Sequence, residues 1–502
     1  MSSKSWQRDV GILILLALLR IAMHVATDGQ YGFHRDELAV LDDARHLAWG
    51  YVAYPPITPW IARIALEWFG PSLIGLRFFG ALAQAVAMVF TGLIARELGG
   101  GRWAQVVAAI AAAIAPVALS MGALFQYITF DYLCWVLVAW LVVRLLRTDR
   151  PRLWIAVGAV IGLGMLCKYT MALFAIGIAG GVLLTPARRY LRSPWLWAGV
   201  AISLLVFLPN LLWQAQHDFV SLTFLQQIHA RDVEIGRADG FLLQQLFGAT
   251  SVATLPLWLA GLYFYCFAAA GARYRMLGWM YAIPLVLFLC TRGRFYYLAP
   301  AYPMLFAAGA VLIERWLAAR SRPGWHLANA ATCALLIGGG ALSAALVLPL
   351  APVGSRLWNI ADKVHDDFRE ELGWRELVAT VARIHAKQPV AERPRLGILA
   401  GNYGEAGAID LYGPALGLPR AISGVNSYWL RGYGAPPPQT LIVLGFSPTD
   451  AAQLFAHCDV VGQVRNRYGV QNEEAKYHHD ILLCRAPRKP WPQLWAGLRS
   501  FG

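Results

Sequence analysis

The sequence is poor in charged residues, which make up 14% of its 502 residues, whereas 58% are apolar. Soluble globular proteins carry roughly a quarter of charged residues, so this composition excludes a chain built only of soluble domains. Instead, apolar runs recur from the N-terminus to about Leu350, each about long enough to cross a bilayer as a helix. We therefore predict a membrane domain over residues 1–350 and a smaller soluble domain over residues 351–502.

Familiar cofactor and metal motifs are also missing. The sequence contains no P-loop and no dinucleotide-binding fingerprint, which argues against a nucleotide as the substrate. Its seven cysteines include no Cys-x-x-Cys pair and no zinc-ligand spacing. Five of them lie in or beside apolar runs, where they are simply interpreted as small buried side chains. Cys458 and Cys484 fall in the predicted soluble domain and could form a disulfide if that domain lies outside the cytosol.

Positive charge is in excess, with 43 Lys and Arg against 29 Asp and Glu and a net charge of +14. The location of this charge argues against nucleic acid as the partner, because many basic residues lie in short loops between apolar runs. Basic loops of this kind hold helix ends at the cytoplasmic surface of a bilayer. The predicted partner is therefore the lipid bilayer.

The apolar runs predict about eleven membrane-spanning helices. They cover residues 10–26, 73–98, 103–120, 125–146, 153–167, 169–184, 195–214, 246–270, 276–291, 296–313 and 327–349. Because Arg20 and His24 interrupt the first run and no convincing cleavage site follows it, we expect an uncleaved helix and not a signal peptide.

The orientation of these helices follows from the loops between them. A cytoplasmic N-terminus makes every inside loop basic, as the positive-inside rule requires. It also leaves the two longest outside loops, residues 28–72 and 215–240, net acidic. An odd number of helices then places the C-terminal domain outside the cytoplasm.

Two further regions carry their own structure. Within loop 28–72, apolar residues recur at helical spacing around residues 38–48 and 60–69, which predicts two helices lying in the membrane interface. The soluble domain is predicted to be α/β, with a helix over residues 374–385. Its predicted strands cover residues 395–400, 440–444, 460–464 and 481–484.

Ionisable side chains gather at the predicted outer ends of the helices. Charge near hydrocarbon is costly, so its presence there indicates function. The set consists of Asp36, Glu37, Asp131, Lys168, His217, Asp218, Arg292 and Arg294. A carboxylate at Asp36 or Glu37 could accept a proton from an attacking hydroxyl or amine, or it could cap the helix that follows. Asp131 is either a second functional carboxylate or a hydrogen-bonded helix entry.

The basic members of this set need an anionic partner on the outer side. Basic residues are usually concentrated on the cytoplasmic side, whereas Lys168, Arg292 and Arg294 are predicted on the outer side. A lipid phosphate could bind to them there. Lys168 could alternatively reach to the interface with its long side chain. His217 and Asp218 could contribute to a metal site, but no further ligand has suitable spacing, so a surface loop is the simpler interpretation. No cofactor is assigned, and a divalent metal is left open.

Several segments resemble the ArnT/PMT-like glycosyltransferases of the GT-C fold. Asp36-Glu37 followed by Gly50-Tyr51-Val52-Ala53-Tyr54-Pro55-Pro56 is similar to the first outer loop of that family. Other similar segments are residues 166–170, 209–217, 296–300, 401–407 and 466–469. The resemblance thus extends over nearly the whole chain and implies a polytopic helical membrane domain with a C-terminal periplasmic α/β domain.

The resemblance also implies an activity: transfer of a sugar from a polyprenyl-phosphate-linked donor to a lipid, glycan or protein acceptor at the periplasmic face of the bacterial inner membrane. The family's first acidic position corresponds to Asp36 or Glu37 and its second to Asp131, although Phe130 stands where the family often has proline. Its phosphate-binding positions correspond to Lys168, Arg292 and Arg294. The matching segments also make Tyr54, His217, Tyr296 and Tyr297 candidates for the substrate pocket.

We expect an inverting single displacement for such an enzyme, with the first-loop acid as the base. The alternative is a polytopic transporter or a flippase for lipid-linked sugars. Transporters usually place ionisable residues near the bilayer midplane, between internal repeats. Here those residues lie at one edge of the predicted membrane domain, and the sequence shows no internal repeat.

Overall fold

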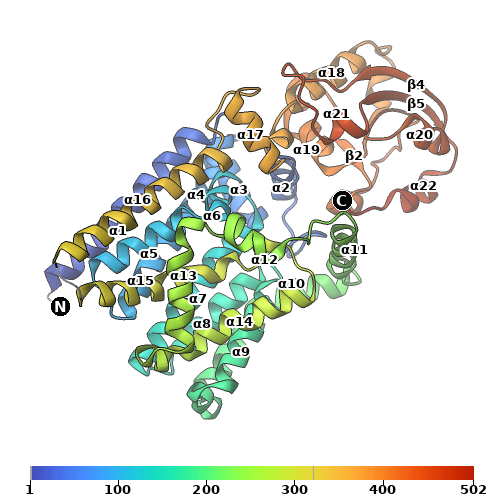
Figure 1. Ribbon diagram of the computed structural model, residues 1–502. Coiled ribbons are helices and arrows are strands. Elements are labelled where there is room, and N and C mark those ends of the chain that lie inside the picture. Colours follow the sequence, from blue (N-terminus) through green and yellow to red (C-terminus); the bar gives the residue numbers. More distant parts are fainter. Residues whose placement is uncertain (1–2, 320–321) are drawn as a thin grey trace.

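A computed structural model describes residues 3–319 and 322–502. Its first part is a bundle of helices, and its last part is a small domain built around one sheet (Figure 1). The bundle helices are α1 Ser3–Thr27, α4 Leu73–Glu97, α5 Arg102–Ala113, α6 Pro116–Ala123, α7 Tyr127–Thr148, α8 Leu153–Met165, α9 Met171–Leu184, α10 Pro194–Gln216, α13 Leu255–Cys266, α14 Arg275–Cys290, α15 Tyr302–Ala318 and α16 Arg322–Val347.

Each of the eleven predicted stretches overlaps one of these helices. The predicted stretch 103–120 is divided between α5 and α6, which meet at an angle of 64°. The division follows from Pro116, because proline lacks the amide donor that would continue α5 and forces extended backbone on Ala115. Among the described residues, six helices are long and apolar enough to cross a membrane, or nine if each bent pair is one span. The chain is thus a multi-pass membrane protein, whereas the count of eleven spans stays a prediction.

Shorter helices fill the predicted outer loops. The loop over residues 28–72 contains α2 Arg35–Arg45 and α3 Ile57–Phe69, as its helical spacing predicted. The loop over residues 215–240 contains α11 Val220–Glu234, and α12 Phe241–Gln244 follows it. In Figure 1, α2 and α11 lie between the bundle and the sheet domain, and the N-terminus lies at the far end of the bundle.

The C-terminal part is an α/β domain, as predicted. Its strands are β1 Leu396–Ala400, β2 Ala421–Ser423, β3 Thr440–Leu444, β4 Phe455–Gln463 and β5 Asp480–Pro487, in the order β2-β1-β3-β5-β4. β1 pairs in parallel with β2 and β3, whereas β5 pairs antiparallel with β3 and β4. Its helices are α17 Arg356–Val364, α18 Trp374–Ala386, α19 Tyr403–Tyr412, α20 Pro448–Leu454, α21 Glu473–Tyr477 and α22 Trp491–Leu498.

Two details of this domain extend the sequence prediction. β2 was not predicted, because a strand of three residues carries almost no alternating pattern. Cys458 on β4 and Cys484 on β5 lie opposite each other in the sheet and form a disulfide bond. The pairing that the sequence left open is therefore present in the structure.

Candidate functional site

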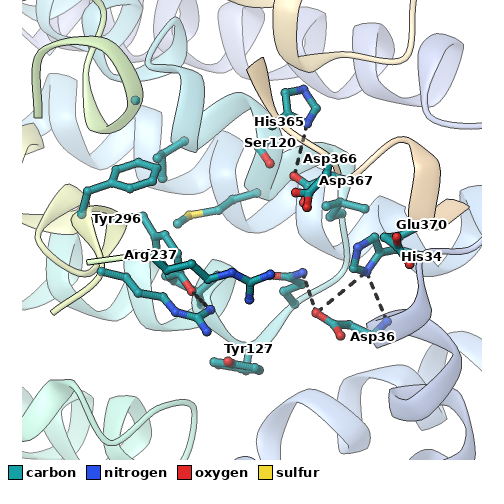
Figure 2. A pocket seen from close by; sticks show the side chains of 18 of the residues that line it. His34, Asp36, Ser120, Tyr127, Arg237, Tyr296, His365, Asp366, Asp367 and Glu370 are labelled. Atoms are coloured by element: carbon teal, nitrogen blue, oxygen red, sulfur yellow. Dashed lines mark hydrogen bonds and ion pairs between the residues drawn. The ribbon is translucent and has the colours of Figure 1, made fainter. Parts of the chain in front are cut away.

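A large cavity of about 2100 Å³ lies between the bundle helices and the sheet domain. Figure 2 shows its polar part, with Asp36 and His34 on one side and Arg237 and Tyr296 on the other. Six of the predicted site residues line it: Asp36, Tyr54, Lys168, Arg294, Tyr296 and Tyr297. The other four, all within the described part of the chain, are absent from its lining: Glu37, Asp131, His217 and Arg292.

Asp36 is held in the first turn of α2 with its carboxylate open to the cavity. His34 is the N-cap residue of this helix, and its Nδ1 accepts a hydrogen bond from the Asp36 backbone N–H at 3.2 Å. The carboxylate accepts two hydrogen bonds, from Tyr403 Oη at 2.9 Å and from Gln126 Nε2 at 3.1 Å. Its side chain remains 36% exposed. Both partners are neutral, so this carboxylate is oriented without being neutralised by an ion pair.

Glu37 faces the opposite way, into the protein. Its side chain is 0% exposed and forms a bidentate ion pair with Arg77 of α4, at 2.9 Å to Oε1 and 2.8 Å to Oε2. Oε2 also accepts the His34 backbone N–H, completing a capping box, and Oε1 accepts the backbone N–H of Phe125. The helix-capping role considered for the two acids is thus the one that Glu37 has in the structure.

Lys168 lies between α8 and α9 with its ammonium group against aromatic rings. Nζ is 3.8 Å from the centre of the Tyr297 ring and 5.3 Å from the centres of the Tyr127 and Tyr296 rings. The side chain is only 7% exposed, and Nζ has no hydrogen-bond partner among the described residues. Cation–π contacts hold such a charge in place but leave its N–H donors free. Lys168 therefore lies in the wall of the cavity with its ammonium group buried and without a hydrogen-bond partner among the described residues.

Asp131 lies behind this lysine and not in the cavity lining. Its carboxylate accepts hydrogen bonds from Thr170 Oγ1 at 2.9 Å and from Trp135 Nε1 at 3.1 Å. It is buried and interacts electrostatically with Lys168. It is thus placed to balance the charge of the lysine from the protein side.

Arg294 belongs to a cluster of three arginines that share one carboxylate. It donates to Asp232 Oδ2 at 2.6 Å and to Tyr296 Oη at 2.8 Å. Arg231 and Arg237 lie 3.9 Å and 4.0 Å from the other oxygen of Asp232, and both line the cavity. The cluster carries an excess of positive charge. Sequence reasoning missed Arg231 and Arg237, because the loop that holds them was assessed only by its net acidic charge.

The remaining predicted residues have local partners. Tyr54 lines the cavity and donates to Asp43 Oδ2 at 2.6 Å. Arg292 forms an exposed ion pair with Asp239 at 3.1 Å. His217 stacks on the Trp213 ring, with 4.0 Å between ring centres. Among the described residues there is no group of three or more His, Cys, Asp or Glu side chains that could hold a metal ion.

The rest of the cavity is apolar and follows α16. Ala331, Leu335, Leu342 and Val347 contribute to this wall, and Phe247 and Val252 line the cavity as well. The helix from Ala331 to Val347 extends for about 24 Å, at about 1.5 Å per residue. Most of α16 is exposed on the bundle surface, so this wall lies at the lipid-facing side of the protein. The cavity therefore joins a charged chamber to a long apolar groove.

Comparisons with known proteins agree with this architecture. Residues 53–213 match the family described as dolichyl-phosphate-mannose-protein mannosyltransferase. The lipid A galacturonosyltransferase RgtD of Rhizobium johnstonii is 28% identical over 324 residues, which cover 61% of this chain and 65% of RgtD. The chain thus spans just under two thirds of that relative's length.

Solved structures match over most of the chain. The structure of ArnT from Cupriavidus metallidurans bound to undecaprenyl phosphate matches with a TM-score of 0.59 and 14% identity, covering 96% of this chain and 98% of ArnT. The oligosaccharyltransferase of Archaeoglobus fulgidus in complex with zinc and sulfate matches with a TM-score of 0.53 and 14% identity, covering 87% of this chain and 68% of the other. These two matches show the fold. Together with the sequence matches, they show that the chain is similar to the ArnT/PMT-like glycosyltransferases and has their fold.

Proposed function

We propose that this protein transfers a sugar from a polyprenyl-phosphate-linked donor to a lipid, glycan or protein acceptor at the periplasmic face of the bacterial inner membrane. Two side chains in one cavity carry this proposal: the accessible carboxylate of Asp36 and the unpartnered ammonium group of Lys168. A base on one side and a phosphate-binding cation on the other are the two functions that such a transfer requires. The lipid A named for RgtD and the undecaprenyl phosphate bound to ArnT support the same class of reaction.

The donor would occupy both parts of the cavity. Its phosphate would lie against Lys168 and the arginine cluster around Arg294, where three N–H donors of the ammonium group are free. Its polyprenyl chain would follow the apolar wall of α16 toward the lipid. Arg292 pairs with Asp239 at the surface, so we assign it at most an indirect contribution to donor binding.

The reaction would be a single displacement with inversion. Asp36 takes the proton from the hydroxyl or amine of the acceptor while the acceptor's oxygen or nitrogen attacks the anomeric carbon. The bond from that carbon to the phosphate oxygen breaks, and its electron pair leaves with the polyprenyl phosphate. Lys168 and Arg294 stabilise the charge that develops on the phosphate, a contribution of about 3 kcal/mol for a well-placed donor. Asp131 would balance Lys168 from behind.

We assign the base to Asp36 and not to Glu37, because both oxygens of Glu37 are held by Arg77 in a closed ion pair. A carboxylate in that position has no exposed oxygen to receive a proton from a substrate. Asp36, in contrast, keeps neutral partners and an exposed edge on the cavity.

The orientation of the protein is part of the same proposal. The basic loops predicted for the cytoplasmic side support a cytoplasmic N-terminus. The sheet domain, residues 351–502, would then be periplasmic and the membrane domain would comprise residues 1–350. The N-terminus and the sheet domain lie at opposite ends of the bundle, which is consistent with this orientation (Figure 1).

The test is transfer of radiolabelled sugar by the purified protein from a panel of polyprenyl-phosphate-linked pentoses, hexoses and uronic acids. We expect wild-type protein to transfer or hydrolyse one donor of the panel, and Asp36→Asn to abolish turnover while undecaprenyl phosphate still binds. Turnover retained by Asp36→Asn would move the base to Glu37 or Asp131. Movement of intact donor across proteoliposomes without sugar transfer would instead support a flippase. Parallel reactions with EDTA decide whether a divalent metal is required.

A further inference from the structure

The sheet domain touches the proposed base directly, through the segment Gly401–Gly407. This segment is one of those that resemble the family in sequence. α19, which begins at Tyr403, packs closely against α2 at two glycines. A Cβ atom at Gly407 would lie 2.8 Å from backbone atoms of Leu38, so a side chain is excluded there. A Cβ atom at Gly404 would lie 2.8 Å from the Trp374 ring of the sheet domain and 3.0 Å from Arg35 Cβ of α2. The two glycines therefore bring the helix carrying Tyr403 into contact with the helix carrying Asp36.

The start of α19 is fixed by its own caps. The Asn402 side chain accepts the Glu405 backbone N–H at 2.9 Å, and the Glu405 side chain accepts the backbone N–H groups of Asn402 and Gly401. This capping box defines the first residue of the helix and hence the direction in which Tyr403 leaves it. The Arg35 guanidinium lies 4.9 Å from the centre of the Tyr403 ring and holds the ring from the side of α2.

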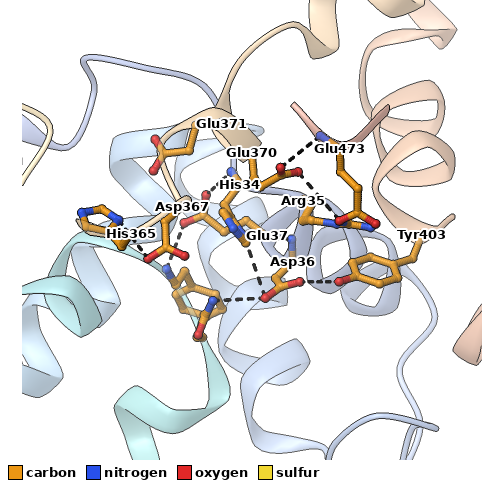
Figure 3. A network of polar contacts seen from close by, with 12 residues as sticks. His34, Arg35, Asp36, Glu37, His365, Asp367, Glu370, Glu371, Tyr403 and Glu473 are labelled. Carbon is orange, nitrogen blue, oxygen red and sulfur yellow. Dashed lines mark hydrogen bonds and ion pairs between the residues drawn. The ribbon is translucent and has the colours of Figure 1, made fainter. Parts of the chain in front are cut away.

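These contacts direct one hydroxyl group to one carboxylate oxygen. Tyr403 Oη donates to Asp36 Oδ1 at 2.9 Å, and Gln126 donates to Oδ2, so the carboxylate is held from two sides (Figure 3). We propose that Tyr403 is a positioning residue, which holds the Asp36 carboxylate in the orientation needed to accept the proton of the acceptor. This rests on the proposed function of Asp36. The sheet domain thus completes the reaction centre.

The surroundings keep Tyr403 suited to this role. Burial and the neighbouring Asp36 carboxylate raise the pKa of Tyr403 above its ordinary value, so the hydroxyl remains protonated and can only donate to Asp36. Other titratable groups near Asp36 include His34, at 3.8 Å, its neighbour Arg35, and Tyr54 and Tyr127, which interact electrostatically with the carboxylate. Arg35 forms an ion pair with Glu473 of the sheet domain, so its charge is balanced there.

Tyr403→Phe removes the hydroxyl group and keeps the ring. Tyr412→Phe is the matched control, because Tyr412 lies on the same helix but its side chain interacts with Arg375 of the sheet domain. We expect kcat of Tyr403→Phe to fall about tenfold or more, as for a misplaced catalytic group, with KM for the donor changed less than about twofold. The acidic limb of the pH–rate profile should move to higher pH, because a hydrogen bond donated to a carboxylate favours its charged form. Tyr412→Phe should behave as wild type in both measurements.

A measurement that needs no donor accompanies the kinetics. Unfolding temperatures of wild type, Asp36→Asn, Tyr403→Phe and the double variant form a cycle, in which the two substitutions should not be additive because the side chains share one hydrogen bond. Additive shifts, or wild-type kinetics for Tyr403→Phe, would overturn the proposal. A lower kcat with an unchanged pH–rate profile would also overturn it, because general destabilisation of the fold lowers kcat without moving the profile. A different result would show that the proposed function is wrong: the Asp36→Asn variant itself would retain turnover.

Discussion

Replacing Glu37 with Gln should destabilise the protein, although the two side chains have nearly the same shape. Glu37 is 0% exposed and Arg77 is 1% exposed, and they share two charge-assisted hydrogen bonds. Removing one charge of a buried pair leaves the other charge buried and uncompensated, which costs about 3–5 kcal/mol. Arg77 keeps some partners, since it also donates to the Asp28 and Gly32 carbonyl groups and lies 3.2 Å from Glu371. We therefore expect a loss near the lower limit, about 3 kcal/mol.

The assay is equilibrium unfolding by denaturant in detergent micelles, with Asp36→Asn as the matched control. Asp36 is partly exposed and its two hydrogen-bond partners are neutral, so its replacement should cost only about 1 kcal/mol. The two neighbouring substitutions should therefore affect different properties. Glu37→Gln should lower the stability but retain turnover while folded, and Asp36→Asn should be nearly as stable as wild type but inactive. A Glu37→Gln protein as stable as wild type and without turnover would refute this reasoning and make Glu37 the base.

Two further predictions concern the charges around the cavity. Lys168→Met should raise the dissociation constant for undecaprenyl phosphate, measured by titration calorimetry, about tenfold to a hundredfold, which is the effect of losing one charge-assisted hydrogen bond. The control Arg292→Gln should leave this constant unchanged, because Arg292 is exposed and paired with Asp239. Burial raises the pKa of Glu370 to about 8, so between pH 4.5 and 8 the folded protein binds more protons than the unfolded chain and its stability falls as the pH rises. Glu370→Gln removes this part of the decline, so it should raise the unfolding temperature at pH 8.5 and leave it unchanged near pH 4.5; an equal change at both pH values would contradict the assignment.

The helical part of the fold could be predicted because the bilayer makes composition informative. Each predicted apolar stretch overlaps a helix, since a chain in hydrocarbon must satisfy its backbone within the segment. The same rule does not indicate where a span bends, and the break between α5 and α6 depends on the single residue Pro116. In the sheet domain, β3 Thr440–Leu444 was predicted to the residue because all its side chains but one are buried. The three-residue β2 offered no comparable signal.

The candidate site could be predicted where a charged residue lies within apolar sequence. Lys168 is the only lysine between Lys4 and Lys363, and it interrupts two apolar runs, which made it conspicuous without any structure. Arg231 and Arg237 were hidden for the opposite reason, because they lie in a loop rich in acidic residues. Tyr403 could not be found at all, because its partner Asp36 is 367 positions away in the sequence. Charge patterns show which residues need a partner, but they do not show which distant element supplies it.

Asp36 and Glu37 show how a partner that is distant in the sequence decides the role of a charged residue. Consecutive residues on a helix point about 100° apart, so adjacent acids at the start of α2 cannot face the same environment. Which of them turns inward is decided by Arg77, forty positions further along the chain on α4. The acid that faces this buried arginine is neutralised by it and stabilises the fold, and its neighbour is left facing the cavity with a free carboxylate edge. Chemistry at Asp36 therefore depends on the structural use of Glu37, because only a fixed α2 holds the carboxylate between Tyr403 and Gln126.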